Sequence, residues 1–156
     1  MNTPQNPTKA VLQGWLDSSD IDYHLCGECD GLHISALQSL EGIVDSRLFR
    51  ERYGLLLTTE LEIRPVALLA VSADIGRLNM GYPTLKVFLD VVDDGMPQLV
   101  AAGILPSGGG VSREQFTQFT RLTIENVARL LEECRELDYL FVLPEDAAPP
   151  PSRAVH

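Results

Sequence analysis

The sequence predicts an α+β domain, in which an antiparallel sheet of hairpins is packed by helices in the order α-β-β-β-α-β-β-α. Three observations predict this class. Short segments of alternating polarity, typical of half-buried strands, are separated by turn residues. Two later segments, 65–78 and 112–137, carry apolar residues at helical spacing, and a further helical stripe opens the chain. The 156 residues suffice for one such domain without a stabilising metal or disulfide.

The first helix begins near Thr8, whose hydroxyl suits an N-cap. Its apolar stripe consists of Val11, Leu12, Trp15 and Leu16. Residues 21–26 then alternate in polarity, which predicts a strand, and residues 32–35 predict its partner after a tight turn. The chain should therefore enter its sheet through a short hairpin.

Residues 42–50 and 54–63 predict a second hairpin. Pro65 suits a first helical turn and starts the predicted helix 65–78. This helix is apolar almost all round, so we expect it to be covered on two sides, by the sheet and by another element or subunit.

Residues 84–92 and 98–105 predict the last hairpin, across the strong turn signal Asp94-Gly95. The clearest helix follows over 112–137, where Ser112 and Gln115 form a capping-box pattern. Its apolar stripe consists of Phe116, Phe119, Ile124, Val127, Leu130, Leu131, Cys134 and Leu137. Cys134 is therefore expected to pack in the core.

We expect one domain over residues 9–143. Residues 1–8 are polar with two prolines, and residues 144–156 form a Pro-rich tail, so both ends are predicted to be disordered. No apolar run reaches the ~18 residues of a membrane span, and the start of the chain lacks the features of a signal peptide. We expect a cytoplasmic protein without a membrane partner.

The net charge of −10 and the sequence pI of about 4.6 disfavour direct nucleic-acid binding. Such binding rests on cationic patches that release counterions from the phosphate backbone. The densest basic group here, Arg47, Arg50 and Arg52, is interspersed with acids. A regulatory role would therefore run through other proteins or small molecules.

Residues 26–33 read CGECDGLH and hold two thiols and a histidine, side chains that bind zinc or take part in redox chemistry. If Gly27-Glu28 is a two-residue turn, Cys26 faces Cys29 across the hairpin. His33 then lies about 13 Å along the strand from Cys29, at ~3.3 Å per residue. That separation is too large for His33 to share a metal ion with both thiols.

The same register leaves His24 as the imidazole nearest to the thiols. Its core face consists of Tyr23, Leu25, Leu32 and Ile34. We predict a structural hairpin and no metal site, cofactor or catalytic residue. The candidates left open are Cys26, Cys29 and His24 as metal ligands, and Cys26 with Cys29 as a redox pair. Thioredoxin-like activation is not expected, because the pair lies between strands beside Glu28 and Asp30 rather than at a helix N-terminus.

Short motifs over about residues 11–144 resemble, in order, those of the YbjN family, which includes the AmyR-type regulators. They are WLD at 15–17; Cys26, Cys29, Leu32 and His33; Gly42 and Asp45; IRP at 63–65; AD at 73–74; VFLD at 87–90; DD at 93–94; EQF at 114–116; and Phe119 with Arg121.

The resemblance implies a fold similar to that of type III secretion chaperones, an antiparallel sheet packed by helices. Those chaperones are small, acidic, non-enzymatic proteins that hold extended stretches of client proteins, often as dimers. The family is described as regulatory and is linked to stress tolerance, motility and exopolysaccharide production. No catalytic residues are established for it, so none is carried over to this chain.

We therefore expect a non-enzymatic, cytoplasmic protein that acts as a regulator or chaperone-like adaptor. Its partner would be a protein client or regulator, bound through an apolar surface of the sheet or of the helix 65–78. The alternative partner for the same surface is a second copy of the chain, which would give a homodimer. The alternative function is a thiol-based metal or redox sensor that uses Cys26 and Cys29.

Overall fold

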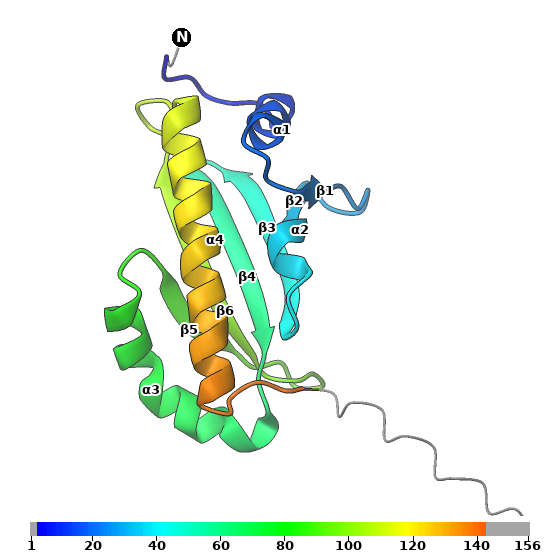
Figure 1. Cartoon of the computed structure of the whole chain (residues 1–156), viewed down its shortest axis with the longest axis vertical. Coiled ribbons are helices and arrows are strands. Elements are labelled where there is room, and N and C mark those ends of the chain that lie inside the picture. Colours follow the sequence, from blue (N-terminus) through cyan, green and yellow to red (C-terminus); the bar gives the residue numbers. More distant parts are fainter. Residues whose placement is uncertain (1–2, 143–156) are drawn as a thin grey trace, which may run out of the picture.

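The structure is a computed structural model that describes residues 3–142 (Figure 1). Its elements, in chain order, are α1 (Lys9–Ser18), β1 (Tyr23–His24), β2 (Leu32–Ile34), α2 (Ser35–Gln38), β3 (Ile43–Glu51), β4 (Gly54–Glu62), the 3-10 helix η1 (Pro65–Ala67), α3 (Leu68–Gly81), β5 (Lys86–Asp90), β6 (Gln98–Pro106) and α4 (Arg113–Glu136).

The six strands form one sheet in the order β1-β2-β3-β4-β6-β5, and every neighbouring pair is antiparallel. The predicted α+β class is confirmed. Four strands precede α3, in agreement with the four predicted segments, whereas the expected order counts three and is wrong by one strand. The short helix α2, which is only one turn long, was not predicted.

The two longer hairpins form as predicted. In the first, Glu51 pairs with Gly54 across the turn residues Arg52 and Tyr53. In the second, β5 pairs with β6 from Lys86 to Asp90. Strands of this length carry enough alternating apolar residues to fix their own register.

Both predicted helix caps are also present. The Thr8 side chain accepts a hydrogen bond from the Val11 N–H at 3.3 Å. Ser112 and Gln115 form a full capping box, in which each side chain accepts from the backbone N–H of the other residue, at 3.2 and 2.9 Å. Each cap satisfies backbone donors that the first turn of the helix leaves unpaired.

The predicted register of the first hairpin is wrong. His24 pairs with His33, so the thiols lie in a loop over residues 25–31 and not at a two-residue turn. Leu25, expected in the core, is 51% exposed. The reason is that β1 is only two residues long, whereas β2 is also held from its other side, where His33 pairs with Arg47 of β3.

One face of the sheet carries the core, and α4 runs across it (Figure 1). A Cβ at Gly103 of β6 would lie 3.0 Å from Thr123 Oγ1 and 3.3 Å from the Phe119 ring, so glycine lets α4 approach the sheet closely. At the N-terminal end of α4, Trp15 of α1 packs on Phe116 with ring centroids 5.5 Å apart.

The helix α3 packs beside β5 and also contacts α4, where Arg77 bonds Glu133. Val71 and Leu78 are buried there, and the Asn79 side chain bonds both the N–H and the C=O of Val87 at 2.9 Å. The second covering layer that the sequence predicts for this helix does not come from the part of the chain that the structure describes.

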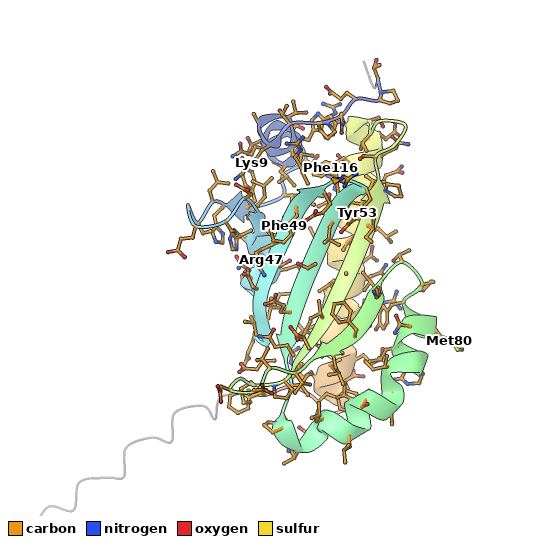
Figure 2. The ribbon with its side chains drawn as sticks, turned by 180° about the vertical axis from the view of Figure 1, so that it is seen from behind. Lys9, Arg47, Phe49, Tyr53, Met80 and Phe116 are labelled. Carbon is orange, nitrogen blue, oxygen red and sulfur yellow. The ribbon has the colours of Figure 1, made fainter. Side chains whose placement is uncertain are left out.

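The other face of the sheet has no helix over it within residues 3–142 (Figure 2). Near the N-terminus, Gln5 forms a two-way backbone bridge with Val111 at 3.0 and 2.8 Å, and Pro7 is buried. Both residues belong to the segment 1–8 that was expected to be disordered. The predicted Pro-rich tail, 144–156, lies outside the described residues. No helix within residues 3–142 has the length and apolarity needed to cross a membrane.

Candidate functional site

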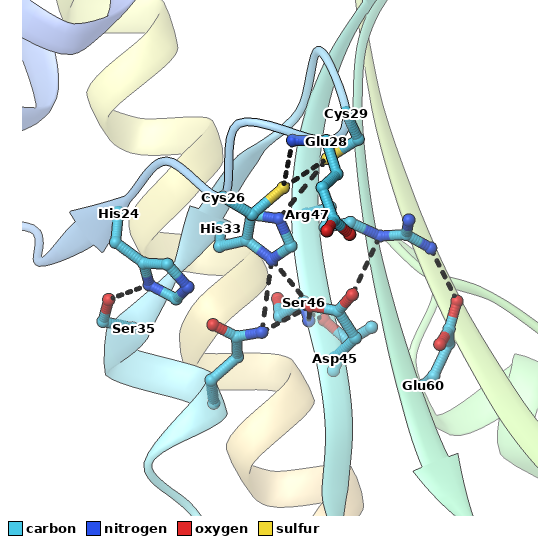
Figure 3. A network of polar contacts seen from close by, with 12 residues as sticks. His24, Cys26, Glu28, Cys29, His33, Ser35, Asp45, Ser46, Arg47 and Glu60 are labelled. Carbon is cyan, nitrogen blue, oxygen red and sulfur yellow. Dashed lines mark hydrogen bonds and ion pairs between the residues drawn. The ribbon is translucent and has the colours of Figure 1, made fainter.

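A thiol–imidazole cluster lies at the edge of the sheet, where the loop 25–31 folds over β2 (Figure 3). The Cys26 and Cys29 sulfurs are 3.3 Å apart, and the Cys29 sulfur is 3.4 Å from His33 Nε2. The three ligand atoms all lie within 4.8 Å of one another. In the described part of the chain, this is the one group of three or more His, Cys, Asp or Glu side chains close enough to hold a single metal ion.

The structure corrects the predicted ligand set. His33, which the two-residue turn placed too far away, joins both thiols, because the longer loop bends back over its own strand. His24, the predicted helper, is not part of the group. Its Nδ1 hydrogen-bonds Ser35 Oγ at 2.8 Å, and its ring stacks on that of His33 with centroids 4.9 Å apart.

A carboxylate supports the buried imidazole from β3. His33 is 7% exposed, and its Nδ1 lies 3.0 Å from Asp45 Oδ1. Asp45 is itself held by the Ser46 N–H at 2.8 Å, by Arg47 Nε at 3.2 Å and by the Gln38 amide. One ring nitrogen of His33 thus faces the carboxylate and the other faces the thiols.

Hydrogen bonds within the cluster favour the thiolate form of Cys26 and the protonated form of His33. The Glu28 backbone N–H donates to the Cys26 sulfur at 3.4 Å and, with Cys29 and His33, lowers the pKa of the Cys26 thiol to about 6. Burial acts to lower the pKa of His33, but its hydrogen bonds with Cys26 and Asp45 outweigh burial and raise that pKa. The thiols lie in a loop and not at a helix N-terminus, and the donor that lowers the pKa of Cys26 is the Glu28 backbone.

Cys134 stays apart from the cluster. It is fully buried on α4, and burial raises the pKa of its thiol to about 12. The prediction of a packed core residue is confirmed.

Sequence reasoning missed Asp45 and Gln38 as parts of the cluster. Asp45 reaches His33 because His33 pairs with Arg47, and residues two apart on a strand share a face. Gln38 comes from the unpredicted helix α2. Only knowledge of which strand lies beside β2, and in which register, would have connected Asp45 to His33.

A second feature runs from η1 along α3 and is called here the outer face of α3; it consists of Val66 in η1 and of Leu69, Ala73, Gly76 and Met80 in α3. Val66 at the start is 80% exposed, Leu69 84% and Met80 83%. Positions alternately three and four apart fall on one side of a helix, and Met80 points away from the sheet in Figure 2. No other atom lies within 4 Å of the place where a Cβ of Gly76 would sit.

The open face of the sheet is mixed in character. Phe88 and Ile104 are 38% and 49% exposed there. Arg47 and Lys86 interrupt the apolar side chains, and Arg47 is bonded to Glu60 at 3.0 Å (Figure 3). This face is therefore less continuously apolar than the outer face of α3.

The chain is similar to a known family over most of its length. The family model YbjN, described as "Putative bacterial sensory transduction regulator", matches residues 8–136. The YbjN proteins of Escherichia coli strain K12 and of Shigella flexneri are each 31% identical to this chain over 140 residues, which cover 90% of this chain and 87% of the relative.

The fold agrees with this match. The crystal structure of YbjN from E. coli superposes with a TM-score of 0.86 at 30% sequence identity, and the match covers 90% of this chain and all of that one. The family's description is regulatory and names no enzymatic activity.

Proposed function

The chain belongs to the YbjN family, and we propose that it is a regulatory protein that acts by binding another protein through the outer face of α3. The observation that carries this proposal is the run of exposed apolar side chains on that face. A single exposed leucine needs no explanation, but a contiguous apolar stripe marks a site of interaction.

The shape of the stripe favours a helical partner. Large side chains, Leu69 and Met80, flank the small residues Ala73 and Gly76. Small residues let a second backbone approach closely, while the large ones pack on either side of it. With a net charge of −10, the chain favours a partner helix whose apolar face is bordered by basic residues.

The open sheet face is the weaker docking surface. Arg47 and Glu60 already pair on it, so a partner would have to compensate buried charge there. A second copy of this chain would bring another −10 charge, which disfavours self-association at low ionic strength. We place the activity in the cytoplasm, where thiols such as Cys26 and Cys29 stay reduced.

Site-specific photo-crosslinking in the native cell tests the docking surface. We expect a photo-reactive residue at Leu69 to form an adduct with a distinct protein, and the adduct to disappear when Ala73→Arg is added. The same residue at Leu122, which is 45% exposed on α4, is the matched control. Identical adducts at both positions, or none at Leu69, would contradict the proposal, and an adduct of two copies of the chain would reassign the surface to self-association.

Regulation is tested separately, by comparing expression profiles. Leu69→Glu should reproduce the profile of a strain lacking the gene, whereas Leu122→Glu should match the parent. If Leu69→Glu also matches the parent, the outer face of α3 has no regulatory role.

A thiol-based sensor is the second candidate function, favoured by the convergence of Cys26, Cys29 and His33. Replacing Cys26 and Cys29 by serine distinguishes the two candidates. Loss of regulation with the fold and the α3 adduct intact would support a sensor, and unchanged regulation would remove it.

A further inference from the structure

We propose that Cys26, Cys29 and His33 form a zinc-binding site with three protein ligands and an open fourth position. The residue types are the first support. Two thiolates and one imidazole form a ligand set that zinc accepts in tetrahedral sites. No fourth His, Cys, Asp or Glu joins this group in the described part of the chain, so water or an external ligand would complete the tetrahedron.

The distances are close to those that zinc requires. Zinc–sulfur bonds of about 2.3 Å and zinc–nitrogen bonds of about 2.0 Å, at tetrahedral angles, separate two sulfurs by roughly 3.8 Å and a sulfur from a nitrogen by roughly 3.5 Å. The observed separations are 3.3 Å between the sulfurs of Cys26 and Cys29 and 3.4 Å from Cys29 to His33 Nε2. Movements of a few tenths of an ångström would bring these two separations to the zinc values, and the third pair, Cys26 and His33, lies within 4.8 Å.

The second support is the orientation of His33. Its Nδ1 faces the Asp45 carboxylate at 3.0 Å, which favours a proton on Nδ1 and leaves the Nε2 lone pair directed at the thiols. Histidines that bind zinc commonly donate their other ring N–H to a carboxylate in this way. The sheet sets this arrangement in place, because β2 and β3 are paired at His33 and Arg47.

The loop is suited to small movements of the ligand side chains and to exchange of the metal ion. Gly27 has a φ of +77° and open space around it, so the turn between the thiols is not held by side-chain packing. Cys26 is exposed, so solvent reaches the cluster from its side.

The position of the site favours a role in signalling over a role in stabilising the fold. A structural zinc site is normally closed by four protein ligands, whereas this one is open, and the core lies on the other face of the sheet. The proposal is independent of the α3 docking surface, and it rests on the second candidate function only for its biological use. If the chain binds zinc in vitro but zinc produces no regulatory response, the zinc site is supported and the sensor function is refuted.

Metal titration of the reduced full-length chain tests the site. We expect one Zn²⁺ per chain, measured by competition with a chromophoric chelator, and one Co²⁺ with the thiolate charge-transfer and visible bands of tetrahedral Co²⁺. Cys26→Ser, Cys29→Ser and His33→Gln should each weaken binding at least tenfold and change the Co²⁺ spectrum. Circular dichroism checks the fold of each variant, and Cys26, being exposed, remains a valid test if His33→Gln does not fold.

His24→Gln is the matched control, because this imidazole stacks on His33 without joining the group. It should change zinc affinity less than threefold. Absent binding, binding unaffected by Cys26→Ser, or equal loss in His24→Gln would each overturn the proposed ligand set. So would a chain whose thiols form a disulfide and whose reduced form takes up no metal.

Discussion

The Nδ1 atom of His33 on β2 lies 3.0 Å from the Asp45 carboxylate on β3, and this pair ties the ring that faces the thiols to the neighbouring strand. Asp45 is not one of the three residues close enough to share a metal ion, so it acts on the site through His33. It is therefore a positioning residue, and its removal should affect metal affinity more than fold.

We expect Asp45→Asn to weaken zinc binding by about 10–100-fold, the usual effect of losing such a partner. The measurement is the Kd for zinc, together with the ¹⁵N NMR shifts of His33, which should report a changed tautomer in the variant. Glu60→Gln is the control, since Glu60 also bonds Arg47 but does not touch His33. Equal effects of the two variants, or unchanged His33 shifts, would refute the positioning role.

Zinc should stabilise the folded chain without being required for it. At a free concentration a hundredfold above its Kd, zinc should add up to about 2.7 kcal/mol to the free energy of unfolding. Chelator should remove that increment and leave a cooperative unfolding transition, because the core does not depend on the loop. Urea unfolding with and without zinc measures this, and Cys26→Ser should show no increment. A chain that loses its fold in chelator would make the site structural.

The two sides of α3 should respond oppositely to substitution. Leu78 is fully buried against the core, so Leu78→Ala should lower the free energy of unfolding by about 2–5 kcal/mol. Leu69 is 84% exposed, so Leu69→Glu should change it by less than about 0.5 kcal/mol. Urea titration of both variants gives the comparison. A large loss of stability in Leu69→Glu would mean that its effect on regulation reports folding and not docking.

Close approach of α4 to the sheet depends on Gly103. A side chain there meets Thr123 and Phe119 at 3.0–3.3 Å, and Gly103→Ala should destabilise the chain by about 1–3 kcal/mol. Gly108→Ala is the control, since nothing lies within 4 Å of its added Cβ. Thermal unfolding distinguishes them, and equal melting temperatures would show that α4 can move away from β6 at no cost.

A charged network between α3 and α4 should make stability depend on acid pH. Hydrogen bonds from Arg77, then from Tyr139, hold the pKa of Asp74 below its ordinary value of 3.8. Hydrogen bonds from Tyr82 and Arg77 likewise hold that of Glu133 below 4.5. As the pH falls, these two carboxylates therefore take up protons at a higher pH in the unfolded chain than in the folded chain. The stabilisation is present above about pH 5 and is lost as the pH drops through the folded-state pKa values.

The variant Asp74→Asn tests this network. At pH 7 it should lower the free energy of unfolding by about 0.5–1 kcal/mol, because Arg77 is largely exposed and its interactions are screened. The difference from the parent should shrink as the pH falls below 3.8, the ordinary pKa of the aspartate carboxyl, towards its lowered folded-state pKa. Glu132→Gln, which removes an exposed pair with Arg135, is the control. A difference that persists at low pH would assign the loss to packing.

Much of this fold follows from the sequence by itself. The hairpins 42–50/54–63 and 84–92/98–105, the capping box at Ser112 and the burial of Cys134 all depend on residues close together in the chain or on one periodic stripe. Alternation with period two and apolar spacing near 3.6 encode such elements directly. The sequence also predicts, from the same spacing, that the helix 65–78 is apolar almost all round.

The site was decided by the tertiary structure. His33 meets the thiols, and Asp45 meets His33, because β2 takes its register from β3 and not from the two-residue strand β1. A short hairpin has too few side-chain pairs to fix its own register, so a local rule placed the turn at Gly27-Glu28 and excluded His33. The sequence thus determined which residues carry the chemistry, and only the pairing of β2 with β3 decided which of them converge.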